Sequence, residues 1–177
     1  MYVGVDNPVE IVSGGHKTID RQQVSASNAT VTGENGYFLV RPIHEGEVQV
    51  TVKTGGKEAA RKFIATPITP VPRLGAQFAD GAILGNGAFK AQQGLAAVVE
   101  CCGFDAKCDI VSYTVIRMNK AGELSRADNQ GARYELAAMA LVKEARPGDM
   151  YIFCRIMARC PGDKEPRRLE TVGISIE

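Results

Sequence analysis

The sequence predicts a mostly β protein made of two small domains. Three observations lead to this prediction. Short strand-like runs separated by turn signals fill the first third of the chain, a cluster of prolines then interrupts it, and the remainder combines strand-like runs with one helical pattern. Hydrophobic residues make up 45% of the 177 residues, an ordinary globular fraction, so a buried core is expected without help from a metal.

The first predicted domain covers residues 1–66 and consists of strands. Val48, Val50 and Val52 alternate with polar residues, which is the period of two of a half-buried strand. Shorter strand-like runs are expected at 2–5, 9–12, 22–27, 37–40 and 61–65. Short strands with a turn signal about every eight to twelve residues are typical of an immunoglobulin-like sandwich. The domain is small for such a fold, so it is expected to depend on its neighbour or on a partner.

Residues 67–72 form the predicted linker. Pro67, Pro70 and Pro72 fall within this stretch. Proline fixes φ and has no amide hydrogen to donate, so an extended, semi-rigid connector is expected.

The second predicted domain, residues 73–177, is mixed. Strands are expected at 95–100, 110–117, 150–158 and 169–176. Between them, Tyr134, Ala138, Leu141 and Ala145 recur at helical spacing, which predicts a helix near 133–145. Proline and glycine within residues 146–149 end it.

Charge and hydropathy exclude two classes of partner. Lys and Arg total 21 against 20 Asp and Glu, and there is no Trp, so neither a basic surface nor stacking aromatics favour nucleic acid. No run approaches the ~20 apolar residues that cross a bilayer, so this segment is not expected to insert into a membrane. Residues 1–10 lack a basic segment followed by an apolar run. The chain is therefore expected to be cytoplasmic, or exported by a leader or anchor outside this sequence.

The residues that usually carry catalysis are sparse, and no enzyme activity or cofactor is predicted. The histidines, His16 and His44, lie beside turn residues. The run Gly14–Thr18 resembles the end of a phosphate-binding loop, but His16 stands where that motif requires glycine before the lysine. Acidic residues form no paired motif.

The cysteines leave three alternatives open. They are Cys101, Cys102, Cys108, Cys154 and Cys160, and an odd number leaves at least one unpaired within a monomer. Buried or idle thiols, one structural disulfide and a metal site are each compatible with this count. The spacings lack the paired C-x2-C arrangement that zinc favours, so no metal site is predicted.

The most charged local feature is a basic cluster around an expected turn at 161–163. It consists of Arg155, Arg159, Lys164, Arg167 and Arg168. One interpretation is a solvated hairpin end, and the other is a docking patch for an acidic surface of a partner.

Several segments resemble a known family. Residues 1–11 include the run YVGVDNP, which resembles the start of the C-terminal region of the GldM/PorM proteins of type IX secretion and gliding motility. The likeness continues, in order, through residues 36–42, 103–107, 111–115 and 146–153. It therefore spans nearly the whole chain.

The resemblance implies a fold and a function. It implies two β-sandwich-like domains, the first immunoglobulin-like and the second with one packed helix, from the end of a periplasmic shaft. It also implies a homodimer that docks to an outer-membrane ring of a lipoprotein and its partner (GldK/GldN- or PorK/PorN-like), with no catalytic residues. Family members carry an N-terminal transmembrane helix, so the chain is expected to be either a fragment of an inner-membrane-anchored protein or a short relative.

Two rival functions remain as hypotheses. The first is a stand-alone envelope adhesin or carbohydrate-binding protein with a groove rich in Tyr37 or Tyr113. The second is an enzyme that uses Cys101 or Cys102 as its nucleophile, which requires a thiol that is accessible in the native state.

Overall fold

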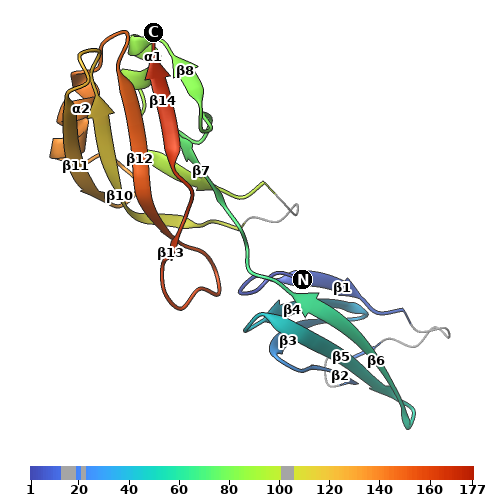
Figure 1. The fold of residues 1–177 in the computed structure, drawn as a ribbon. Helices are drawn as coiled ribbons and strands as arrows, with labels where there is room; N and C mark the ends of the chain where they lie inside the picture. The colour runs from blue at the N-terminus through green and yellow to red at the C-terminus, as the bar shows by residue number, and fades with distance from the viewer. Residues whose placement is uncertain (13–18, 21–22, 101–105) are drawn as a thin grey trace. The chain divides into compact units, whose positions relative to one another are not determined.

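A computed structural model describes residues 1–12, 19–20, 23–100 and 106–177 (Figure 1). Most of them lie in antiparallel strands, as the predicted fold class requires. The chain divides into two compact units. Unit 1 contains Met1–Ile68 and Pro161–Asp163, and unit 2 contains Thr69–Cys160 and Lys164–Glu177.

Unit 1 is a sandwich of two three-stranded sheets. One sheet has the order β1-β4-β3 and the other β2-β5-β6. Their bounds are β1 Asn7–Glu10, β2 Val24–Ala26, β3 Ala29–Glu34, β4 Tyr37–Pro42, β5 Gly46–Thr54 and β6 Lys57–Ala65. Both sheets contribute to one valine-rich core, with Phe38 and Val40 from the first sheet and Val48 and Val50 from the second. This confirms the alternation predicted for β5.

Two segments of unit 1 differ from the sequence predictions. Residues 2–5 form no strand; Tyr2 makes an isolated bridge with Thr66, and the Gly4 amide donates to the Pro42 carbonyl. Conversely, the sequence did not predict β3, because only Val31 of its six residues is buried. Its hairpin with β4 turns at Asn35 and Gly36, both with positive φ, as the Asn-Gly pair favours.

Unit 2 is built on a larger, mostly antiparallel sheet. Its main path runs β11-β10-β12-β14-β8, with β13 paired to the end of β12. The strands are β8 Ala82–Leu84, β10 Asp109–Met118, β11 Leu124–Gln130, β12 Met150–Arg159, β13 Arg167–Arg168 and β14 Val172–Ile176. A second, two-stranded sheet pairs β7 Val71–Leu74 with β9 Leu95–Val98. The pair β14 and β8 is parallel, while the other neighbours are antiparallel.

One face of the large sheet is covered, and we call it the inner face. Helices α1 (Asn86–Lys90) and α2 (Leu136–Lys143) and the small sheet pack against it around a shared core. Tyr151 and Phe153 of β12 are fully buried there, and the Tyr151 ring lies 4.4 Å from that of Phe89 in α1. The sequence predicts one helix near 133–145, and α2 lies within that range. The short α1 is a second helix.

A disulfide joins β10 and β12 at the end of the large sheet where β10 begins and β12 ends. Cys108 precedes β10 and Cys160 follows β12, and the two are bonded across 52 residues of sequence. Of the alternatives left open by the sequence, this selects a structural disulfide for that pair. Cys154 is a free, partly buried thiol. Cys101 and Cys102 lie outside the described residues.

Candidate docking site

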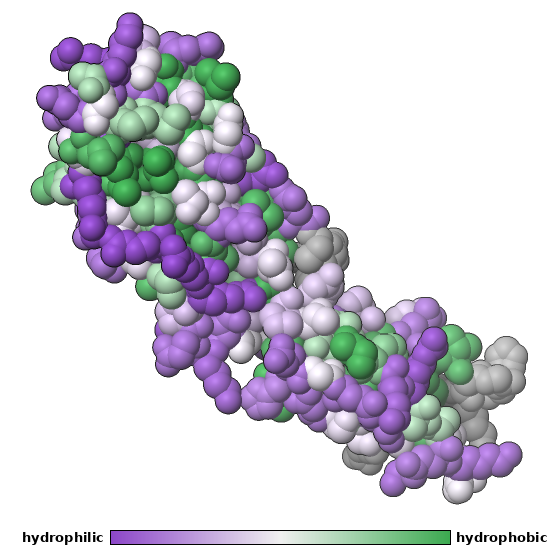
Figure 2. All heavy atoms as spheres, in the orientation of Figure 1, coloured by the Kyte–Doolittle hydropathy of each residue, from purple (hydrophilic) through white to green (hydrophobic). Residues whose placement is uncertain are grey.

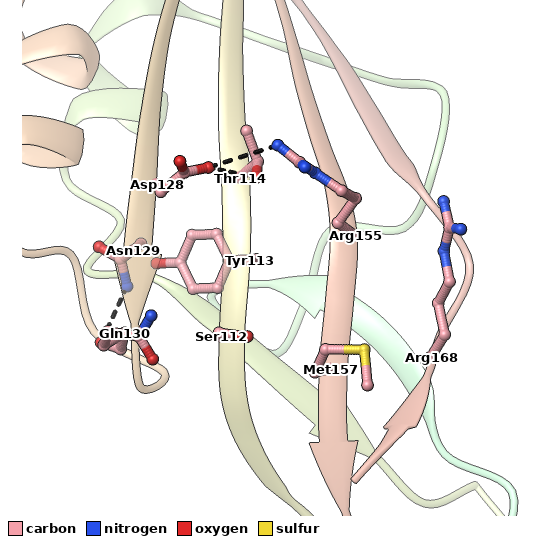
Figure 3. A pocket seen from close by; sticks show the side chains of 9 residues that line it. All are labelled: Ser112, Tyr113, Thr114, Asp128, Asn129, Gln130, Arg155, Met157 and Arg168. Carbon is pink, nitrogen blue, oxygen red and sulfur yellow. Dashed lines mark hydrogen bonds and ion pairs between the residues drawn. The ribbon is translucent and has the colours of Figure 1, made fainter.

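The opposite, outer face of the large sheet carries a polar hollow of about 450 Å³ (Figure 3). Strands β10, β11, β12 and β13 build it. Its lining residues are Ser112, Tyr113, Thr114, Asp128, Asn129, Gln130, Arg155, Met157 and Arg168. Two hydroxyls, an amide, a carboxylate and two guanidinium groups therefore meet beside the thioether of Met157, whereas the Tyr113 and Asn129 side chains are buried.

A β-bulge places one of these guanidinium groups. Thr114 pairs with Cys154 and Ser112 with Met157, so two residues of β12 stand opposite one residue of β10. Arg155 lies in this bulge with a φ of 51°, in the left-handed region that few non-glycine residues adopt. The bulge turns the Arg155 side chain outward while Ile156 continues into the core.

Asp128 is the centre of the charge network in the hollow. Its carboxylate accepts a hydrogen bond of 2.6 Å from the Thr114 hydroxyl and two of 3.0 Å from the Arg126 guanidinium. Arg155 is a more distant partner, at 3.6 Å. The hydrogen bond from Thr114, followed by those from Arg126, holds the pKa of Asp128 below its ordinary value. The carboxylate is therefore charged at neutral pH and already has closer partners than Arg155.

The predicted basic cluster is only partly brought together. Arg155 and Arg168 line the hollow. Arg167 pairs with Ala158 in the β12–β13 ladder and is half-buried. Arg159 is exposed and stands opposite Asp109, while Lys164 is exposed beyond the end of β12. The docking role of these five residues stays a prediction.

Sequence reasoning missed most of the hollow. Ser112, Thr114, Asp128 and Gln130 come from two strands whose pairing brings them to one face. Strand β11 was missed because only Ala127 and Asn129 of its seven residues are buried. The signal that could have revealed this strand is the alternation of Ala127 and Asn129 with the charged or polar residues on either side of them.

Other chemistry is sparse in the part of the chain that the structure describes. No group of three or more His, Cys, Asp or Glu side chains there could hold a metal ion. No helix there is long and apolar enough to cross a membrane. His16, the rest of Gly14–Thr18, and the two candidate nucleophiles Cys101 and Cys102 lie outside the described residues.

Fold and site together define a β-sandwich protein with an open polar hollow on one sheet face. The model of the GldM C-terminal domain family matches residues 67–177, more than half of the chain. The chain therefore belongs to the GldM C-terminal domain family, as its sequence segments indicated. Proteins of this family are structural components of the gliding-motility and type IX secretion machinery in the cell envelope. No curated protein matches the chain in a sequence comparison.

Proposed function

We propose that this chain is a non-catalytic, periplasmic interaction module of a type IX secretion or gliding-motility component. It acts as a homodimer and docks to an outer-membrane ring made of a lipoprotein and its partner (GldK/GldN- or PorK/PorN-like). Membership of the GldM C-terminal domain family carries this proposal.

The disulfide supports the periplasmic location. Disulfides such as Cys108–Cys160 persist in oxidising compartments, including the bacterial periplasm, and are rare in the cytoplasm. Cys108 and Cys160 are both buried, which protects the bond from reduction.

The hollow supports a docking role. Arg155 and Arg168 present guanidinium groups to solvent on a face that no described helix covers. Guanidinium groups bind carboxylates through paired hydrogen bonds, so an acidic partner surface fits them. Figure 3 shows both side chains beside the hollow, on neighbouring strands.

The glycan-binding alternative loses one of its two aromatic residues. Tyr113 is buried in the inner core, where its ring centroid lies 6.1 Å from that of Phe153, and its hydroxyl donates to the Ala132 carbonyl. Its ring face is therefore closed to a sugar. Tyr37 is exposed, but it belongs to unit 1.

The test is a binding experiment with the GldK- and GldN-like proteins of the same organism. We expect the purified chain to have the mass of two copies by light scattering and to bind these proteins in biolayer interferometry. Arg155→Glu with Arg168→Glu should weaken binding, whereas Lys143→Glu on α2, on the covered side of the sheet, should not. A monomer that binds neither ring protein would contradict the proposal.

A further inference from the structure

A row of mostly apolar side chains crosses the outer face of the large sheet. In the strand register, Leu124 stands opposite Met118, Met118 opposite Met150, Met150 opposite Ser175 and Ser175 opposite Ile83. Side chains that are directly opposite on one face of a sheet touch one another. Four of the five residues in this line across β11, β10, β12, β14 and β8 are therefore large and apolar.

A second row lies two residues further along the strands. Ile116 stands opposite Ile152, between Arg126 on β11 and Gly173 on β14. We call the six side chains Leu124, Met118, Met150, Ile83, Ile116 and Ile152 the apolar rows. On that flank of Ile152, the Asp80 carboxylate lies at Gly173 and accepts its backbone amide at 2.7 Å.

Three of these side chains are exposed, and the other three, Met118, Ile116 and Ile152, are half-buried, whereas those on the inner face are fully buried. Leu124 is 69% exposed, Ile83 64% and Met150 38%, while the inner-face neighbours Tyr151 and Phe153 are fully buried. Figure 2 shows hydrophobic side chains gathered over β10, β11 and β12 on the face toward the viewer, with hydrophilic side chains bordering them. Contiguous apolar patches with a polar border mark interaction sites on soluble proteins.

The polar border has an excess of positive charge. Arg126 stands beside Ile116, Arg155 lies in the bulge that follows Cys154, and Arg168 is further along the sheet, opposite Met157. The carboxylates on this face include those of Asp128 and of Asp80, which accepts the Gly173 amide. Asp80 is occupied by the Gly173 amide, and the Asp128 carboxylate is held most closely by Thr114 and Arg126. The guanidinium groups of Arg155 and Arg168 can therefore pair with carboxylates of a partner.

We propose that the outer face of the large sheet is the surface that docks the partner, with the apolar rows at its centre and Arg126, Arg155 and Arg168 on its rim. The partner is a protein surface with an apolar centre bordered by carboxylates. This inference rests on the proposed function and specifies where docking occurs. Buried apolar contacts supply affinity, and rim charges supply orientation and association rate.

The same charges disfavour a second copy of this chain on this face. A two-fold contact brings a patch against itself, and here each copy would bring three arginines, Arg126, Arg155 and Arg168, against two aspartates, Asp80 and Asp128. Like charges brought together across an interface oppose association. The dimer contact of the proposed function therefore lies elsewhere on the molecule.

The experiment measures binding of the full chain to the GldK- and GldN-like proteins by biolayer interferometry. Leu124→Glu with Met150→Glu places two carboxylates in the apolar rows, and we expect at least about a tenfold rise in Kd, mostly from faster dissociation. Arg155→Gly with Arg168→Gln should lower the association rate and its salt dependence, because it removes charge and keeps the bulge conformation. Lys143→Glu is the matched control and should change neither rate.

Three results would overturn the inference, and each is distinct. Unchanged binding of the Leu124→Glu, Met150→Glu protein, with wild-type binding intact and an unaltered circular dichroism melt, would overturn the assignment of this face. Conversion of a dimer to a monomer by the same variant would assign the face to a second copy instead. Failure of the wild-type chain to bind either ring protein would remove the proposed function and the inference with it.

Discussion

Strands β10 and β12 carry apolar side chains on both faces, yet the two faces have different surroundings. On the inner face, Tyr113, Val115, Tyr151 and Phe153 are buried beneath helices and a second sheet. On the outer face, equally apolar neighbours such as Met150 remain partly exposed. Apolar composition alone therefore does not distinguish a core from a binding surface. The difference lies in which elements the rest of the chain supplies to cover each face.

The largest expected effect on stability comes from truncating a side chain on the inner face, and the matched truncation on the outer face should have almost none. Phe153→Ala empties a site with ring partners at 6.1 and 6.3 Å, and it should lower the free energy of unfolding by about 4 kcal/mol. Leu124→Ala, on the exposed outer face, should change it by less than about 0.5 kcal/mol. Urea unfolding measures both values. Similar losses in the two variants would show that the outer face is also buried in solution.

Removal of the Cys108–Cys160 disulfide should destabilise unit 2 almost as much as Phe153→Ala does. In the chain-entropy account, a cross-link over 52 residues is worth about 4 kcal/mol. Replacing Cys108 and Cys160 together by alanine should therefore lower the thermal midpoint by many degrees. Cys154→Ala removes the free, partly buried thiol and serves as the control, with a small change. Equal midpoints for the double variant and the control would contradict the structural role of the bond.

An intermediate effect is expected at the start of α2. The Asn129 side-chain amide donates to the carbonyls of Gln130, Gly131 and Arg133, and its oxygen accepts the Glu135 amide at 2.7 Å. Asn129→Ala should cost about 2 kcal/mol, because buried backbone groups lose their partners.

Asn119→Ala is the matched control for that change. Asn119 bonds a turn in a similar way, accepting the amides of Ala121 and Glu123, but water reaches this turn. The loss should stay below about 1 kcal/mol in the same urea measurement. A larger loss of unfolding free energy for Asn119→Ala than for Asn129→Ala would contradict the greater weight given to the buried hydrogen bonds of Asn129.

The smallest effect concerns pH and Asp128. Its pKa is lower in the folded chain than in the unfolded chain, so its contribution to stability is present above the unfolded pKa and is lost as pH falls through the folded pKa. Asp128→Asn should therefore be slightly less stable than the wild type at pH 7, and the difference should shrink below about pH 4. Urea midpoints at both pH values check this. A difference that widens in acid would contradict it.

The sequence predicted the strands with strong alternation and missed those without it. The alternation Val48, Val50, Val52 located β5, and the apolar runs at 110–117 and 150–158 located β10 and β12. Strands β3 and β11 lie at sheet edges and bury few side chains, so their period of two is carried by too few apolar residues.

The candidate site was harder to predict because pairing and a bulge create it. Sequence proximity grouped five basic residues, but strand register brings only Arg155 and Arg168 to the hollow. Their polar companions Ser112 and Gln130 come from strands that are distant in sequence. Likewise, cysteine spacing could not select Cys108 and Cys160, since their proximity follows from the lengths of β10 and β12.

The disulfide also limits how far unit 2 can be stretched. It joins the start of β10 to the end of β12, so the strands β10, β11 and β12 lie within one closed covalent loop. A pull on the two ends of the chain passes through the sulfur atoms instead of through those strands. The 52 residues of the loop would otherwise lengthen the chain by roughly 180 Å at full extension. While the bond is intact, tension along the chain cannot unravel the strands that carry most of the outer face.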